Sequence, residues 1–255
     1  MEDLDTARVV PGCADEMLRT LEGFGLQWDG EVEYQSRRVE AYEAALASLR
    51  SKGLTFQCLC SRRQRAESEE TGYPGTCRDR NATDVPSATR FRIDDAARVD
   101  FDDRFQGECA YALRSMGDVV VRRRDGVFAY QLAVVVDDAY QRITDVVRGA
   151  DLIESTAWQI ALQRALDFDT PRYAHLPLLV EPDGAKLAKS RRSLAADASR
   201  ALELLGSALQ LLHQETPTSL DFESAPALLQ WAANRWNPAT FHGLRTLPAA
   251  PLGRK

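Results

Sequence analysis

Residues 129–156 read AYQLAVVVDDAYQRITDVVRGADLIEST, and this stretch carries most of the information about the fold. Its first part, residues 132–138, is a continuous apolar run that ends in two acids, and it fits either a buried strand or a short helix. Residues 143–148 predict a strand, and residues 149–166 predict a turn followed by a helix. Strands that alternate with helices in this way are typical of an α/β fold with a parallel sheet.

The segments before this stretch predict two helices and several short strands. The first helix, residues 11–26, has an apolar stripe made of Met17, Leu18, Leu21 and Phe24. The second helix, residues 36–52, has Ser36 as its expected N-cap, and its inward side chains should be Val39, Tyr42, Leu46 and Leu49. The expected strands are residues 55–59 and 88–94, and the hairpin arms 118–123 and 127–131 around Asp125-Gly126.

The segments after this stretch predict one more hairpin and a helical tail. Residues 176–180 and 185–188 flank the tight turn Pro182-Asp183-Gly184. From about residue 197 the chain reads as helical. The leucines of this tail are Leu202, Leu205, Leu209 and Leu212.

Composition excludes several classes of protein. The chain has 255 residues, of which 44% are hydrophobic and 27% charged, and these values are ordinary for a globular protein. There is no apolar run of the roughly 20 residues that a membrane helix needs, and the acidic N-terminus is no secretory signal. The cytoplasm is therefore the expected location. A net charge of −6 argues against a bulk basic surface for nucleic acid, although local basic patches remain possible.

Three of the five cysteines lie in residues 56–77, FQCLCSRRQRAESEETGYPGTC. A structural zinc ion takes four ligands, usually cysteine or histidine, but the three histidines of the chain are all distant in sequence. The spacing alone leaves two interpretations open: a zinc site, or three reduced and partly buried thiols. Tyr73 lies four residues before Cys77, and a phenolate next to a metal ion is chemically sound.

Two further segments carry candidate binding residues. PDGAKLAKSRR, residues 182–192, places Lys186 and Lys189 after a turn, where they could contact a polyphosphate or form a solvated basic loop. Tyr130 and Arg148 could line a crevice at the carboxyl ends of the strands, where open α/β folds bind ligands. Arg148 could hold a carboxylate bidentately, or it could pair with Asp145 or Asp151.

Taken together, these segments resemble the class I glutamyl-tRNA synthetase family. The resemblance rests on MEDLD, WDGEVEYQSRR, CLC…YPGTC, RRRDGVFAYQLAVVVDDAYQRITDVVRGADLIEST and HLPLLVEPDGAKLAKS, and it covers most of residues 1–215. It is strongest to a short, stand-alone branch whose members activate glutamate with ATP and transfer it to queuosine in the anticodon of tRNA(Asp). It implies a class I Rossmann-like sheet with a zinc-containing insertion and a short helical tail.

The resemblance also implies roles for individual residues. One structural Zn²⁺ would be held by Cys58, Cys60, Tyr73 and Cys77, so that the tyrosine supplies the fourth ligand. Glu2 corresponds to an acid that holds the amino group of L-glutamate, and Tyr130 and Arg148 correspond to other glutamate-binding positions.

The nucleotide site is implied in the same way. AKLAKS matches the KMSKS-type loop that closes on ATP, with Ala188 where that loop usually has serine. Lys186 and Lys189 are the candidate catalytic residues of this loop, and Lys189 would also contact the phosphates of ATP and its Mg²⁺. His175 and Leu176 match a segment on the adenine side.

The length of the chain distinguishes members of this family. A full-length glutamyl-tRNA synthetase continues into a large helical domain that reads the anticodon, whereas this sequence has only a short tail after the loop. It therefore could not hold the acceptor end and the anticodon together, and the resemblance implies that the anticodon loop of tRNA(Asp) reaches the active site. The protein is expected to be a monomer. The arginines that could contact its phosphates are Arg62, Arg63, Arg65, Arg122, Arg123, Arg124, Arg191 and Arg192. The alternatives are a catalytic fragment of a full-length synthetase, an inactive zinc-containing RNA-binding derivative, and a metal-binding structural domain without a nucleotide site.

The expected organisation follows from the resemblance. Residues 1–53 would be the rest of the first half of the nucleotide-binding fold, 54–115 the zinc-containing insertion, 116–196 the second half with its loop, and 197–255 the tail. Met1 corresponds to a position near the end of the second family strand, so the HIGH-motif segment is expected to be absent and the natural protein longer, with this form a misassigned or truncated gene product. In this form we expect zinc binding, but little or no activation of glutamate.

Overall fold

A computed structural model describes residues 1–61, 73–80, 85–94, 96–181, 196–219 and 221–249. The helices are α1 Cys13–Gly23, α2 Val39–Ser51, α4 Leu113–Met116, α5 Tyr130–Tyr140, α6 Ile153–Ala165, α7 Ala201–Leu211 and α8 Ala225–Ala233. The short 3-10 helices are η1 Thr6–Arg8, η2 Gln35–Arg37, η3 Ala150–Leu152, η5 Ala198–Arg200 and η6 Pro238–Phe241. The strands are β1 Thr55–Cys58, β2 Ala88–Phe91, β3 Arg98–Asp103, β4 Gly107–Ala112, β5 Val119–Arg122, β6 Asp145–Gly149, β7 Arg172–Leu176, β8 Leu178–Val180 and β9 Thr246–Pro248.

The central sheet has the order β4-β3-β7-β6. β7 runs parallel to both of its neighbours, and β4 is antiparallel to β3. A second sheet, β1-β2-β5, is wholly antiparallel. The predicted α/β class is confirmed, and the parallel core of the sheet carries an antiparallel edge.

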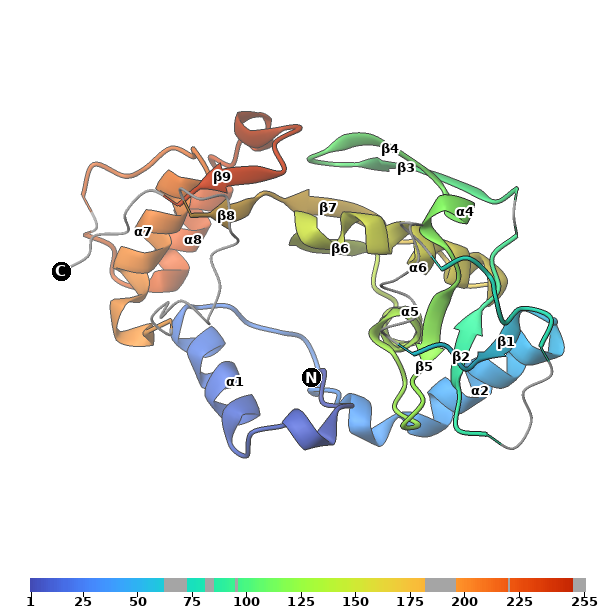
Figure 1. Cartoon of the computed structure of the whole chain (residues 1–255). Coiled ribbons are helices and arrows are strands. Elements are labelled where there is room, and N and C mark those ends of the chain that lie inside the picture. The colour runs from blue at the N-terminus through green and yellow to red at the C-terminus, as the bar shows by residue number, and fades with distance from the viewer. Residues whose placement is uncertain (62–72, 81–84, 95, 182–195, 220, 250–255) are drawn as a thin grey trace.

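Figure 1 shows how these parts are arranged. The β1-β2-β5 sheet lies with α2 at one end of the molecule, and α7, α8, β8 and β9 lie at the other end. The central sheet and the N-terminal segment that contains α1 both run between the two ends. The main hydrophobic core lies around α2, α5 and α6, where residues such as Tyr42, Leu132 and Ile160 are almost fully buried.

The apolar run 132–138 forms part of helix α5. Its periodicity was ambiguous because α5 contacts α2, β5 and α6, so that it is apolar on several sides. The helix is also held by Asp137 at its C-terminal half. This carboxylate accepts hydrogen bonds from Arg38 at 2.7 Å, from the Tyr42 hydroxyl at 2.9 Å and from Gln35 at 2.9 Å.

The start of α2 differs from the prediction in two ways. Helix α2 begins at Val39, and Ser36 lies in η2, where its hydroxyl donates to Asp3 at 2.6 Å instead of capping the helix. Val39 is 43% exposed, although it was expected to face inward. Val39 is exposed because it is the first residue of the helix, whose buried stripe runs through Tyr42, Leu46 and Leu49.

Two other predicted features are only partly observed. The second hairpin arm, residues 127–131, is reduced to a single bridge between Arg122 and Phe128, because α5 already begins at Tyr130. Helix α1 forms as predicted but buries no residue, and Met17 of its apolar stripe is 54% exposed. The last predicted arm, residues 185–188, lies outside the described residues.

A search of the described residues finds no helix with the length and apolar character needed to cross a bilayer.

Candidate functional site

Arg148 lies near the carboxyl end of β6, where its position is set by the pairing of Arg148 with His175 on β7. The side chain is half-buried, and it donates hydrogen bonds from all three nitrogens. Nε donates to Nε2 of His175 at 3.1 Å and Nη1 donates to the Tyr130 hydroxyl at 3.1 Å. Nη2 donates to Oγ1 of Thr156 at 2.8 Å and to Oε1 of Gln159 at 2.7 Å.

The side-chain partners of Arg148 are neutral, so they do not compensate its positive charge. Within the described part of the chain, no carboxylate lies within ion-pair distance of Arg148. Asp145, one of the two predicted alternatives, instead pairs with Arg172 at 2.7 Å. A guanidinium has five N–H groups, and the bonds to described partners leave one N–H on Nη1. A half-buried cation with a remaining donor next to a tyrosine hydroxyl favours an anionic ligand.

Behind Arg148 lies a buried pair formed by His175 and Asp103. The side chains of both residues are fully inaccessible, and Nδ1 of His175 lies 2.5 Å from Oδ2 of Asp103. Burial alone would raise the pKa of Asp103, but hydrogen bonds from the His175 ring and from the backbone N–H groups of His175, Gln106 and Phe105 lower it to about 2. Asp103 is therefore ionised at neutral pH.

Glu2 lines a cavity of about 340 Å³ together with Asp137 and Asp138 of α5, two leucines of α1, and Trp28. Burial raises the pKa of Asp138 to about 6, where Arg148 opposes the rise and Asp137 and Glu2 add to it. Glu2 and Arg148 therefore both act electrostatically on Asp138. The structure places Glu2 on the side of α5 where this acidic cavity opens.

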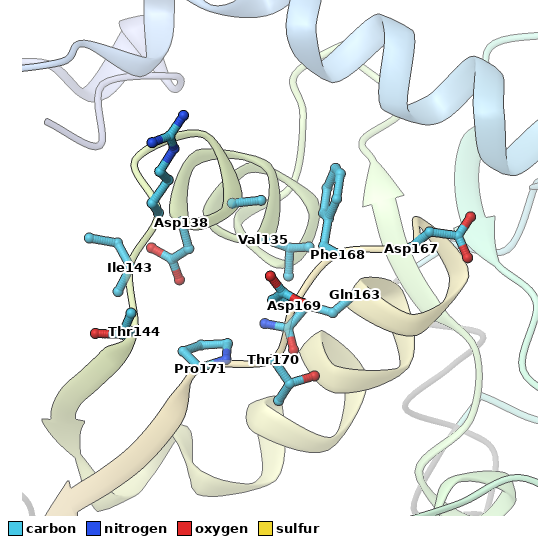
Figure 2. Close-up of a pocket in the computed structure, with 12 residues that line it drawn as sticks. Val135, Asp138, Ile143, Thr144, Gln163, Asp167, Phe168, Asp169, Thr170 and Pro171 are labelled. Carbon is cyan, nitrogen blue, oxygen red and sulfur yellow. The ribbon is translucent and has the colours of Figure 1, made fainter.

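A second cavity of about 470 Å³ lies at the beginning of β6 (Figure 2). Its labelled side chains come from α5, from residues 143 and 144, and from α6 and the segment that follows it. Asp138 lines both cavities. None of the residues predicted to bind substrate lines the second cavity, which lies toward the end of β6 away from Arg148.

The structure describes only some of the remaining predicted residues. Leu176 is half-buried at the end of β7, and the buried ring of His175 has no access to solvent. Lys186 and Lys189 lie outside the described residues, as do Arg62, Arg63, Arg65, Arg191 and Arg192. The other predicted arginines have partners: Arg122 pairs with Glu43 at 3.0 Å, Arg123 pairs with Asp5 at 2.7 Å, and Arg124 donates to the carbonyl of Leu59 at 2.6 Å.

The predicted metal ligands form the thiol cluster, which consists of Cys58, Cys60, Tyr73 and Cys77. The three sulfur atoms lie within 4.8 Å of one another, and Cys60 and Cys77 are 3.6 Å apart. The Tyr73 hydroxyl lies 3.5 Å from the sulfur of Cys58 and 3.9 Å from that of Cys60. Zinc–sulfur bonds of roughly 2.3 Å in a tetrahedron place sulfur atoms about 3.8 Å apart, so the cluster has the size and donor set of a metal site.

Burial and hydrogen bonds shift the pKa values of Cys77 and Tyr73 in opposite directions. Burial would raise the pKa of Cys77, but hydrogen bonds from the Tyr73 hydroxyl, the Leu59 backbone and the other two thiols lower it to about 7. Burial and the neighbouring thiols raise the pKa of Tyr73. A divalent cation reverses that effect because its charge stabilises the ionised ligand.

The loop that carries Tyr73 is held by contacts with the rest of the protein. Tyr73 forms a bridge with Gly117, where an added Cβ would lie 2.2 Å from the backbone nitrogen of Tyr73, so only glycine fits there. The guanidinium of Arg90 lies 3.9 Å from the centre of the Tyr73 ring. Beside Cys77, Arg78 forms a two-point ion pair with Asp118 at 2.7 and 2.8 Å.

Several residues around Arg148 could not be identified from the sequence. Asp103 belongs to the acidic run DFDD, which resembles solvated surface charge, and Thr156 and Gln159 are ordinary helix residues of α6. The spacing of these three residues from Arg148 along the chain forms no recognisable motif. The only available signal was the predicted helix after β6, which places some side chain of α6 near that strand.

Comparisons with known proteins agree on one family. A family model described as tRNA synthetases class I (E and Q), catalytic domain, matches residues 1–208. Proteins named glutamyl-Q tRNA(Asp) synthetase from Ectopseudomonas mendocina, Pseudomonas putida and Pseudomonas aeruginosa are 48%, 47% and 47% identical over 99% of this chain. The matched region covers 85%, 84% and 86% of those proteins.

Solved structures show the same fold. Similar structures include a glutamate tRNA ligase from Elizabethkingia meningosepticum in complex with its amino acid and a glutamate-tRNA synthetase from Elizabethkingia anophelis, with TM-scores of 0.76 and 0.77. Both are 19% identical and match 98% of this chain, which spans 59% and 60% of their lengths.

Proposed function

The chain belongs to the class I glutamyl- and glutaminyl-tRNA synthetase family, and from this premise we propose that it activates L-glutamate with ATP and transfers it to queuosine in the anticodon loop of tRNA(Asp). Its likeness, over nearly the whole chain, to proteins named for that reaction carries the proposal. In the first step the carboxylate of glutamate attacks the α-phosphorus of ATP and pyrophosphate leaves. In the second step a hydroxyl group of queuosine attacks the acyl carbon and AMP leaves.

Glutamate would bind between α5 and β6. The remaining N–H of Arg148 and the Tyr130 hydroxyl would contact the side-chain carboxylate of glutamate, and Glu2 would contact its ammonium group. The support for this assignment is the contact of 3.1 Å between Arg148 and Tyr130 and the absence of a carboxylate partner for Arg148 among the described residues. Glutamine would leave the cation unpaired, which accounts for a preference for glutamate.

ATP would bind with Mg²⁺ beyond the carboxyl ends of β6 and β7, where ligands of open α/β folds bind. Lys186 and Lys189 would stabilise the charge that develops on the phosphates. Leu176 and the backbone of His175 would lie on the adenine side, since the His175 ring is buried against Arg148.

We propose in addition that the thiol cluster binds one structural Zn²⁺, with Tyr73 as the fourth ligand. The support is the convergence of three sulfur atoms and a tyrosine oxygen in a buried site. Such a site closes the segment from β1 to Cys77 and adds its binding free energy to folding.

The proposed function is tested by charging purified tRNAs with radiolabelled glutamate. We expect transfer to tRNA(Asp) that carries queuosine, and none to tRNA(Asp) that carries guanosine at the same position or to tRNA(Glu). Transfer to tRNA(Glu) would identify the chain as the catalytic part of an ordinary glutamyl-tRNA synthetase. Zinc and RNA binding without any glutamate-dependent ATP–pyrophosphate exchange, both in the 255-residue form and in a form extended upstream of Met1, would contradict an enzymatic function.

A further inference from the structure

The orientation of Arg148 depends on a chain of buried hydrogen bonds that begins at Asp103. Oδ1 of Asp103 accepts three backbone N–H groups, those of Phe105 at 3.0 Å, Gln106 at 2.9 Å and His175 at 3.0 Å. The other oxygen, Oδ2, faces Nδ1 of His175. Because both oxygens are in fixed positions and the carboxylate is only an acceptor, the proton of the His175 ring must lie on Nδ1.

The tautomer of His175 determines what the other ring nitrogen can do. Nε2 lies 3.1 Å from Nε of Arg148, which is always a donor, and 3.2 Å from Oγ1 of Thr156. With the proton on Nδ1, Nε2 is an acceptor and receives the Nε–H of Arg148. With the proton on Nε2, two N–H groups would face each other inside a site where His175 has no solvent.

We propose that Asp103 and His175 are positioning residues for substrate recognition: they fix the guanidinium of Arg148 through the Nδ1–H tautomer, so that one Nη1–H and the Tyr130 hydroxyl face the carboxylate of the substrate. This inference rests on the proposed role of Arg148 in binding glutamate. Gln159 and Thr156 hold Nη2 from α6, and His175 holds Nε from β7. Tyr130 holds Nη1 from α5. The guanidinium is therefore held from three elements, and its remaining donor has one direction.

The geometry predicts the effects of three substitutions at Asp103 and His175. In Asp103→Asn, the amide oxygen must stay with the three backbone N–H groups, so its NH₂ faces Nδ1 of His175 and moves the ring proton to Nε2. In His175→Asn, the side chain retains a donor for Asp103 but loses the acceptor for Arg148. In His175→Gln, the longer amide can place an oxygen near the position of Nε2, so partial rescue is expected.

The first measurement is steady-state ATP–pyrophosphate exchange. We expect Asp103→Asn and His175→Asn to raise the KM for glutamate by about 10- to 100-fold, because hydrogen bonds to a charged group are lost, while the KM for ATP changes by less than about threefold. His175→Gln should lie between them and the parent. The control is Asp100→Asn, an exposed acid on the same strand that pairs with Arg98, and thermal unfolding confirms that each variant is folded.

The second measurement reads the tautomer without activity. Long-range ¹⁵N–¹H spectra of ¹⁵N-histidine protein, assigned by loss of the signal in His175→Asn, should show a proton on Nδ1 in the parent and on Nε2 in Asp103→Asn. A parent with its proton on Nε2, or an active Asp103→Asn variant with an unchanged KM for glutamate, would overturn the inference. A parent without glutamate-dependent exchange, even in a form extended upstream of Met1, would contradict the proposed function instead, and the tautomer spectrum would then decide the inference by itself.

Discussion

The thiol cluster takes its four groups from residues 58–77, whereas the Arg148 network takes its groups from β3, α5, β6, α6 and β7. Both sites are largely buried and rich in hydrogen bonds. The cluster closes a short loop, which has a small entropic cost, so it can form once β1 and the bridge to Gly117 are in place. The network requires β3, β7 and β6 to pair in the central sheet and α5 and α6 to pack together.

This difference implies that a substitution in one site should leave the other site unchanged. Among the described residues, no hydrogen bond, ion pair or ring contact joins the two sites, and sites without shared partners usually behave additively. Changes in the cluster should therefore alter folding and metal content, and changes in the network should alter the recognition of glutamate. The four predictions below test this separation.

The largest effect is expected for Cys58→Ser. Loss of one thiolate should release the metal and remove binding free energy that reaches the order of 10 kcal/mol in small zinc sites. Metal analysis should fall from about one zinc per chain toward zero, and hydrogen exchange should show loosening that is limited to residues 54–80. Cys13→Ser, at an exposed cysteine on α1, is the control. A zinc-free parent that is fully folded would contradict the prediction.

Arg148→Ala should affect the other site with little effect on the metal. Removal of a partly buried charge partner costs roughly 2–5 kcal/mol, so kcat/KM for glutamate should fall by at least about 30-fold at constant zinc content. Arg148→Lys should not restore it, because an ammonium group cannot make the divergent bonds of a guanidinium. Arg98→Ala, at an exposed arginine of β3, is the control. If Arg148→Ala exchanges as well as the parent, its assigned role is wrong.

The pH dependence of Asp103 should be smaller but specific. Its pKa of about 2 in the folded protein lies below the ordinary value of 3.8, so its stabilising effect is complete above about pH 4 and is lost as the pH falls through about 2. Urea unfolding of the parent and of Asp103→Asn should differ by roughly 2 kcal/mol more at about pH 5 than at about pH 2. The same gap at both pH values would show that Asp103 does not have a lowered pKa.

The smallest effect is expected for Gln131→Ala. Gln131 does not touch Arg148, but its Oε1 accepts a bond of 2.9 Å from Gln159, which in turn accepts from Arg148. The change removes two neutral hydrogen bonds, because Gln131 also donates to the hydroxyl of Ser155 at 3.0 Å. It should cost roughly 1–2 kcal/mol of stability and change the KM for glutamate by less than tenfold. A fall in kcat/KM for glutamate as large as that of Arg148→Ala would show that the network is more cooperative than its separate contacts indicate. The contrast with the compact thiol cluster would then be wrong.

The sequence predicted the local parts of the molecule well, for physical reasons. Helix α6 and strand β6 follow from periodicity and turn residues, which act over a few positions. The convergence of Cys58, Cys60 and Cys77 follows from their closeness along the chain. The roles of Glu2, Tyr130, Arg148 and Tyr73 as ligands came from the resemblance to a family, and they remain proposals with geometric support.

Only the tertiary structure decided the rest. Whether residues 132–138 form a helix depends on three neighbouring elements around α5, and the exposure of Val39 depends on where α2 begins. The pairing of Asp103 with His175 joins residues 72 positions apart, and nothing in the composition of DFDD distinguishes a buried acceptor from a surface acid. Local patterns along the chain determined most of the elements and the closeness of the three cysteines. Packing between distant strands and helices determined the partners of Arg148, because hydrogen bonds in a core depend on positions that the whole sheet sets.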